Sequence, residues 1–151
     1  MKTARKQIQL AIVNLLKTIS KDNDFEVDLH GRVYDRQIFY DDVESFPTLC
    51  VIKGEEQRLY QPGQAWADLP LQIRIWTKGT KDFDAEEQLE TIFGEIENLL
   101  HNNTRLSFGD NGEFSVDILI NSISDDEGLL ANEKRALGEM EITVRRHIDF
   151  V

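Results

Sequence analysis

The stretch LPLQIRIWTKG, residues 69–79, decides the fold class. Apolar and polar side chains alternate along it. Because neighbouring side chains of a strand point to opposite faces, this period of two predicts a strand that is buried on one face. The residues on the predicted buried face are all aliphatic: Leu69, Leu71, Ile73 and Ile75. The opposite face receives Gln72, Arg74 and Trp76, and an aromatic residue there is expected to pack under a helix, a loop or another subunit.

Two more strands are predicted on the C-terminal side of this stretch. Residues 137–148 repeat the alternation, with Met140, Ile142 and Val144 pointing inward. The stretch FSVDILINSIS, residues 114–124, is expected to be a strand whose apolar residues share one face: Phe114, Val116, Ile118 and Ile120. The tripeptide DNG at residues 110–112 predicts a hairpin turn just before it.

The N-terminal side is less regular. Residues 47–53, PTLCVIK, predict a buried strand that opens with a proline, a residue tolerated at the first strand position. Residues 27–35 predict a short strand with Gly31 inside it, and residues 54–68 an extended arm or hairpin. Cys50 lies within the apolar run 47–53, so we expect a buried thiol in a reducing compartment.

Two segments have the period of amphipathic helices. The apolar stripe of residues 3–20 consists of Ala4, Ile8, Ala11, Ile12, Leu15, Leu16 and Ile19. The stripe of residues 82–101 consists of Leu89, Ile92, Phe93, Ile96, Leu99 and Leu100. A helix, several consecutive strands, a helix and two more strands predict an α+β fold, in which two amphipathic helices pack on one face of a mixed, mostly antiparallel sheet. At 151 residues, we expect a single domain, 1–151.

The charge of the chain is unevenly distributed. Seventeen basic and 28 acidic residues give a net charge of −11. Residues 1–21 carry five basic residues and no acidic one, so the remainder carries 12 − 28 = −16. The basic helix either turns its lysines to solvent or docks against an acidic neighbour, for which residues 82–101, with seven acids and no Lys or Arg, are a candidate. The acidic balance argues against a sequence-independent grip on DNA, and no apolar run is long enough to span a membrane.

A search for catalytic motifs points away from an enzyme. The sequence has no phosphate-binding loop and no G-x-S-x-G elbow. Zinc-ligand spacing is also missing, because Cys50 is a lone cysteine and the three histidines fall in different predicted elements: His30, His101 and His147. We therefore predict no catalytic residue and no cofactor.

The run SISDDEGLLA, residues 122–131, is the remaining candidate for a site. Asp125, Asp126 and Glu127 are consecutive, and consecutive side chains of an extended chain diverge, so they converge poorly on one metal ion. We favour a solvated turn and predict no metal. Leu129 and Leu130 have two interpretations: another copy of the chain covers them, or they cap the core of their own domain.

The order of these segments resembles the tail terminator family of long-tailed phages, whose members are also described as minor tail protein U-like. The resemblance covers nearly the whole chain. The segments that carry it are GRVYD, FPTLCVIKGEE, LPLQIRIWTKG, DAEEQLETIFGEIENLL, INSISDDEGLLA and GEMEITVRR. Its most specific part is the strand followed by SISDDEGLL, a short linker and GEMEITV.

The resemblance implies a structural virion protein and no enzyme. It implies a ring, typically a hexamer of the same chain, that caps the tail tube, ends its polymerisation and offers a surface for head attachment. The implied partners are the tail tube protein and a head-completion or neck protein, at the head-proximal end of a tail assembled in the host cytoplasm. Two alternatives remain: a head–tail joining or neck protein of similar fold, and a non-viral α+β binding module.

Within such a ring, SISDDEGLLA is interpreted as a strand followed by an assembly loop. The residues expected at assembly interfaces are Arg5, Lys6, Arg74, Trp76, Leu129 and Leu130. DNA would pass through the ring without being specifically bound, because phosphate contacts with a basic lining would resist sliding. The channel is therefore expected to be acidic, with Asp125, Asp126 and Glu127 as the first candidates to face it.

Overall fold

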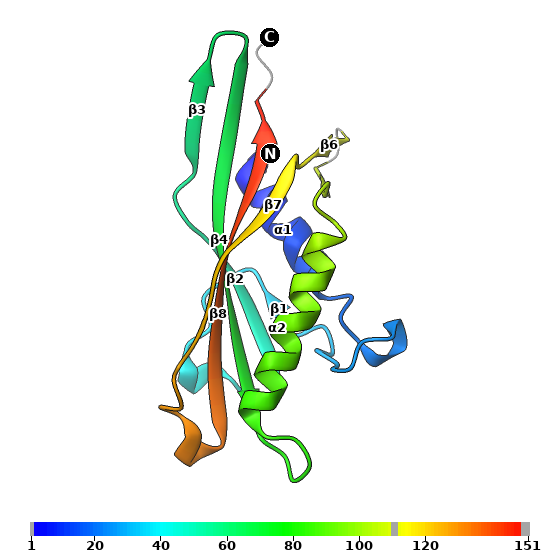
Figure 1. Cartoon of the computed structure of the whole chain (residues 1–151), viewed down its shortest axis with the longest axis vertical. Helices are drawn as coiled ribbons and strands as arrows, with labels where there is room; N and C mark the ends of the chain where they lie inside the picture. Colours follow the sequence, from blue (N-terminus) through cyan, green and yellow to red (C-terminus); the bar gives the residue numbers. More distant parts are fainter. Residues whose placement is uncertain (1, 110–111, 149–151) are drawn as a thin grey trace.

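The computed structural model describes residues 2–109 and 112–148 (Figure 1). The main sheet has the strand order β1-β2-β4-β8-β7, with β3 added beside β4. Its strands are β1 (Val33–Tyr34), β2 (Thr48–Lys53), β3 (Gln57–Gln61), β4 (Gln64–Lys78), β7 (Asp117–Asp125) and β8 (Arg135–His147). Strand β1 runs parallel to β2 and the other pairs are antiparallel, which confirms the predicted mixed, mostly antiparallel sheet.

The long strands β4 and β8 form the centre of the sheet. They are paired without interruption from Trp66 opposite His147 to Lys78 opposite Arg135. The aliphatic residues that the alternation placed inward are at most 1% exposed, which confirms the prediction for both strands: Leu69, Leu71, Ile73, Ile75, Met140, Ile142 and Val144. Strand β4 begins at Gln64, and its first residues pair with β3, so the expected hairpin within residues 54–68 is also confirmed.

Two helices cover one face of this sheet, as expected (Figure 1). Helix α1 (Ala4–Leu16) packs on β1 and β2, and helix α2 (Ala85–His101) packs on β4, β8 and β7. Thr3 and Asp84 cap the two N-termini by accepting hydrogen bonds from backbone N–H groups of the first turn. Among the described residues, no helix is long and apolar enough to cross a membrane.

Helix α1 is shorter than the predicted 3–20. It ends at Leu16, and two tight turns follow, in which Thr18 N–H donates to the carbonyl of Leu15 and Ile19 N–H to that of Leu16. The side chain of Ile19 is nevertheless fully buried. Its burial, and not a further helical turn, explains why the apolar period continues past the end of the helix.

A second apolar cluster lies on the opposite face of the sheet. Cys50 and Trp76 reach it from β2 and β4, and the loop of residues 35–46 lies over them with Ile38 and Val43. Cys50 is fully buried, as predicted, and burial raises the pKa of its thiol. This loop includes the 3-10 turn Tyr40–Asp42; two further 3-10 turns lie at Lys21–Asn23 and Ala131–Glu133.

The strand predicted for residues 27–35 is largely wrong. Only β1, Val33–Tyr34, pairs with the sheet. His30 and Gly31 have φ angles of 50° and 72°, so the chain makes a left-handed turn that breaks an extended strand. Val27 and Leu29 are still buried, which accounts for the strand-like alternation of this segment.

The prediction for residues 114–124 is partly wrong. Strand β7 starts at Asp117, while Phe114 belongs to a separate two-stranded sheet of β5 (Ser107–Phe108) and β6 (Glu113–Phe114). Ser115 fixes this break, since its Oγ accepts from the N–H of Leu106 and donates to the carbonyl of Thr104. Phe114 and Val116 are therefore exposed, while Ile118 is buried as expected. Of the predicted DNG turn, residues 110 and 111 lie outside the described part of the chain.

Candidate assembly surfaces

The acidic run closes the turn after β7. Asp125 Oδ1 accepts a hydrogen bond of 2.9 Å from the N–H of Glu127, and Asp126 Oδ2 accepts one of 3.0 Å from the N–H of Leu130. Glu127 and Gly128 have φ angles of 54° and 83°, which turn the chain back toward β8. Two of the three carboxylates thus shape the loop, and only the side chain of Glu127 makes no such bond within it.

The three acids differ in exposure. Asp125 and Glu127 are exposed, whereas Asp126 is half-buried. In residues 2–109 and 112–148, no group of three His, Cys, Asp or Glu side chains is arranged to hold a metal ion. The carboxylates of Asp125 and Asp126 accept from backbone N–H groups of their own turn, as aspartates in turns commonly do.

The two leucines of this loop have different environments. Leu130 packs against the second apolar cluster, close to the group that includes Trp76 and Leu137. Leu129 is 84% exposed, the largest exposure among the big apolar residues of the described chain. Each leucine therefore fits a different interpretation. Leu130 packs on the core of its own chain, and Leu129 is available to a partner.

The outer face of β4 carries two of the residues expected at an interface. Arg74 Nε lies 3.2 Å from Glu139 Oε1 on β8, and about a third of each side chain is exposed. Trp76 is only 6% exposed, and its ring meets the ring of Tyr40 edge to face at 5.7 Å. Trp76 is thus covered by a loop of its own chain, one of the three covers foreseen for it.

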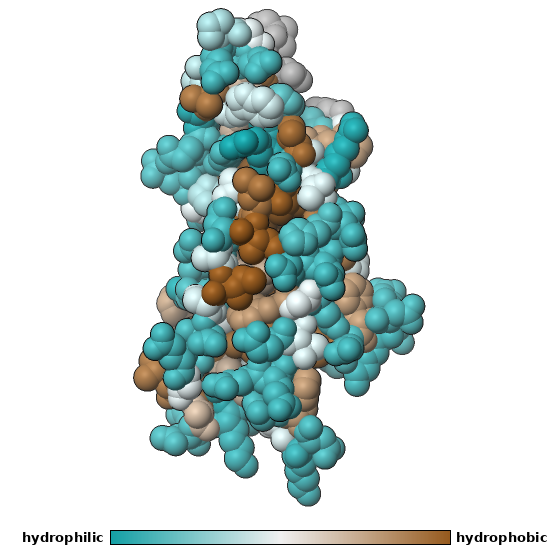
Figure 2. All heavy atoms as spheres, in the orientation of Figure 1, coloured by the Kyte–Doolittle hydropathy of each residue, from teal (hydrophilic) through white to brown (hydrophobic). Residues whose placement is uncertain are grey.

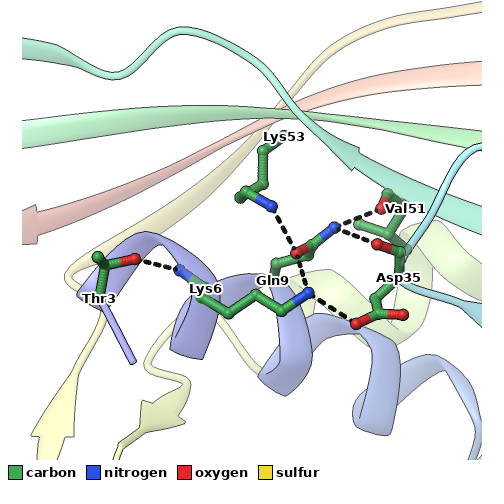
Figure 3. Close-up of polar contacts among 6 residues, drawn as sticks. All are labelled: Thr3, Lys6, Gln9, Asp35, Val51 and Lys53. Atoms are coloured by element: carbon green, nitrogen blue, oxygen red, sulfur yellow. Dashed lines mark hydrogen bonds and ion pairs between the residues drawn. The ribbon is translucent and has the colours of Figure 1, made fainter. Parts of the chain in front are cut away.

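Lys6 lies beside the end of β2 (Figure 3), and Arg5 reaches Gly54, the residue that follows this strand. Lys6 Nζ is 2.7 Å from Asp35 Oδ2, and Arg5 donates to the carbonyl of Gly54 at 2.8 Å. Lys53 adds a third cation, and burial together with the charges of Lys6 and Arg5 lowers the pKa of its ammonium group. The hydrogen bond from Lys6 lowers the pKa of Asp35. Within the described chain, no ion pair joins α1 to α2.

Gln9 holds this basic group together, and sequence analysis did not identify it. Its side chain is 1% exposed and uses both ends (Figure 3). Nε2 donates to the carbonyls of Asp35 and Val51, while Oε1 accepts from the ammonium groups of Lys6 and Lys53. Because these partners are 26 to 44 residues away along the chain, except for Lys6, no local pattern could have revealed them.

A second surface missed from the sequence runs along β7. Apolar side chains gather in a column over this strand (Figure 2), where Leu119 and Ile123 are 41% and 42% exposed. A groove of about 650 Å³ lies between β7 and the C-terminal half of α2, with Glu97 and Asp117 in its walls. Another, of about 580 Å³, lies beside the N-terminal half of α2 and is bordered by Glu86, Glu90 and Asp125.

Comparisons with known proteins agree with this architecture. The family model described as Bacteriophage Tail Tube Terminator Protein matches residues 2–149. The tail tube terminator protein of Escherichia phage T5 is 31% identical over 134 residues, which cover 83% of this chain and 81% of that protein. A chain in the solved virion of a native gene transfer agent particle has the same fold, with a TM-score of 0.63, 13% identity, and coverage of 98% of this chain and 100% of that one. The chain therefore belongs to the bacteriophage tail tube terminator family, as its sequence resemblance implied.

Proposed function

We propose that this chain, a structural component of the virion tail that caps the tail tube, does so as a closed ring of identical subunits, typically a hexamer. The ring ends tube polymerisation at the head-proximal end and presents its free face to a head-completion or neck protein. The observation that carries this proposal is the loop of residues 125–135. Its own carboxylates fix its shape, and yet it holds Leu129 out in solvent. An exposed leucine on a shaped loop supports burial against a neighbouring subunit or the tube.

The test measures the length of tails made without the chain. A phage in which the gene is interrupted should produce tubes that continue past their normal length, and supplying the chain should restore a single length. Negative-stain images give the length distribution and show whether a ring sits at the head-proximal end. Tails of normal length that fail to join heads would contradict the terminator role and favour the neck-protein alternative instead.

The proposal includes an acidic channel through which DNA passes without specific binding. Asp125, Asp126 and Glu127 are its first candidates. Glu127 is the best of them to test, because its side chain is exposed, whereas the carboxylates of Asp125 and Asp126 hold the loop. A lysine at position 127 would place phosphate-binding charge in the path of the genome. We expect the variant Glu127→Lys to assemble and to eject DNA more slowly, with a defect that shrinks as salt is raised.

The matched control for the channel is Glu44→Lys, which makes the same change of charge at an exposed position outside this loop. It should eject DNA like the wild type. Ejection is followed by the fluorescence of a DNA-binding dye after the receptor is added to purified virions. Equal ejection rates for the two variants would place Glu127 away from the channel.

A further inference from the structure

Strand β7 is an edge strand of the sheet. It pairs with β8 on one side only, from Asp117 to Asp125, and its register shifts between Ile120 and Ser122. Soluble proteins shield edge strands with prolines, charged side chains or bulges. Apart from this irregularity, β7 has neither a proline nor a basic residue in its sequence DILINSISD. The exposed Leu119 and Ile123 add apolar surface to its free backbone edge (Figure 2). Such an edge is suited to receive another strand.

Both grooves beside this edge contain acidic side chains. The groove at the C-terminal half of α2 is lined by Glu97 and Asp117, and the groove at its N-terminal half by Glu86, Glu87, Glu90 and Asp125. Neither groove has a Lys or Arg among its lining residues. We call β7 with the facing side of α2 the acidic edge. A strand that docks there should carry positive charge, because otherwise the repulsion among these carboxylates is not offset.

The other side of the same sheet supplies such a strand. Strand β3 pairs only with β4, and all five of its residues are exposed. Arg58 lies on β3, and the cations described above lie at the adjoining end of β2: Arg5, Lys6 and Lys53. We call β3 with these four residues the basic edge. Its acids include Glu55, Asp35, which is bound by Lys6, and Glu56, which is shared by Arg58 and Arg146.

We infer that the basic edge of one copy of this chain docks on the acidic edge of the next, with β3 adding a strand beside β7. The two edges differ and lie on opposite sides of one sheet, so the contact is head-to-tail, and repeating it can close a ring. The cations of the basic edge then face Glu90 and Glu97 across the interface. This inference rests on the proposed ring and specifies which surfaces build it.

Charge reversal gives a test with an internal rescue. The variant Lys53→Glu/Arg58→Glu makes the basic edge negative, and Glu90→Lys/Glu97→Lys makes the acidic edge positive. Each variant alone opposes like charges at every contact, so each should fail to assemble at low ionic strength. An equimolar mixture restores opposite charges at every contact if the two variants alternate, and should therefore give rings with an even number of subunits.

Assembly is measured by light scattering after size exclusion and by negative-stain images, with circular dichroism confirming that each variant is folded. Rings from either folded variant alone at the wild-type yield, or no rings from their mixture, would overturn the inference. Lys53 also donates to Gln9, so the basic-edge variant carries a risk of misfolding. A second measurement therefore uses substitutions that leave the charges intact.

That measurement is crosslinking within assembled virions. Leu59 on β3 and Leu119 on β7 are exposed, and the native Cys50 is fully buried and does not compete. With a short bis-maleimide, Leu59→Cys/Leu119→Cys should give a ladder of covalent multimers. Each single variant should stay monomeric, because equivalent positions do not meet in a head-to-tail contact. In the control Leu59→Cys/Phe39→Cys, Phe39 lies outside both edges and is more exposed than Leu119, so poor access cannot explain a missing ladder. This control should give no ladder.

The outcomes separate the inference from the function it rests on. Rings on tails without the ladder would show that the subunits meet through other surfaces, leaving the terminator ring intact. Crosslinks from β7 to the tube protein would show that the acidic edge receives the tube and not a second copy. Tails of uncontrolled length without a ring in the wild type would refute the proposed function itself.

Discussion

Gln9 is a buried polar residue that ties α1 to β2 and to the loop after β1. It sits on the buried side of α1 beside Ile8 and Ile12, where a glutamine breaks the apolar stripe. It is stable there because its amide donors and its acceptor are satisfied by Asp35, Val51 and Lys53, which lie outside α1, and by Lys6 on the same helix. The sequence identified Arg5 and Lys6 from charge alone, but the group that positions Lys6 and Lys53 exists only once α1 is packed on β2.

Glu95 on α2 gives a pH-dependent prediction at the same scale. Burial and the charge of Glu26 raise the pKa of its carboxyl, while the N–H of Glu26 donates to Oε1 at 2.6 Å, and Oε2 is buried without a hydrogen-bond partner in the described chain. Because the folded pKa exceeds the unfolded value of about 4.3, the folded state binds more protons in the window between the two values. Stability therefore falls as pH rises through this window.

The variant Glu95→Gln removes the buried charge and keeps an oxygen to accept from Glu26. We expect its urea midpoint at pH 7 to lie above that of the wild type, and the difference to vanish at about pH 3, where the glutamate is protonated in both states. A midpoint at pH 7 below that of the wild type would show that the carboxylate is stabilising where it lies.

At the scale of elements, the predictions succeeded where the local period and the tertiary environment coincide. Strands β4 and β8 lie in the middle of the sheet with one face under the helices, so alternation alone located them. Residues 27–35 and 114–124 alternate as well, but a left-handed turn at His30 and the hydrogen bonds of Ser115 end their pairing. Alternation reports which side chains are buried, and a loop against the core can satisfy it without a strand partner.

Gly138 lies where side chains of α2 pack tightly on the sheet. A Cβ at this position on β8 would lie 2.5 Å from Leu89 Cδ1 and 2.5 Å from Phe93 Cζ, two side chains that are themselves buried. The variant Gly138→Ala must push α2 outward or force poor rotamers, and we expect it to lower the free energy of unfolding by about 1–3 kcal/mol. Chemical denaturation of the isolated chain measures this loss.

A matched control for Gly138 lies on the helix that faces it. A Cβ on Gly94 of α2 would meet nothing within 4 Å, and its backbone is helical. Gly94→Ala should therefore raise the free energy of unfolding by about 0.5–1 kcal/mol through helix propensity alone. A Gly138→Ala variant as stable as the wild type would mean that α2 can move away from β8 without a loss in the free energy of unfolding.

At the scale of the whole molecule, the sheet has exposed edge strands on both of its sides. Its centre is buried by two helices on one face and by the loop 35–46 on the other, while β3 and β7 remain open at the edges. The family resemblance could be recognised from the order of segments. The edge strands could not be recognised, because a strand is an edge only relative to strands that are distant in the sequence. That some acids of α2 lie beside β7 is likewise evident only in the folded chain.

Substitutions of the exposed Leu129 and the half-buried Leu130 test assembly and stability separately. Leu129 is 84% exposed, so Leu129→Ser should change the stability of the isolated chain by less than about 0.5 kcal/mol. If Leu129 is buried by the tube or by a neighbouring subunit, the same variant should leave many tails uncapped and longer than normal. Image-based length distributions, together with denaturation of the purified chain, measure the two effects independently.

Leu130→Ala should have the opposite effects, a loss of stability with normal capping of the tails. Leu130 is half-buried against the second apolar cluster, so its truncation should cost about 1–2 kcal/mol, less than a fully buried leucine would lose. At a temperature where this chain is still folded, its tails should reach the normal length, because the side chain meets its own core and not a partner. The contrary result is normal capping by Leu129→Ser together with defective capping by folded Leu130→Ala. It would assign the partner contact to Leu130 and not to Leu129, and the assembly surface would then include the second apolar cluster beneath the loop.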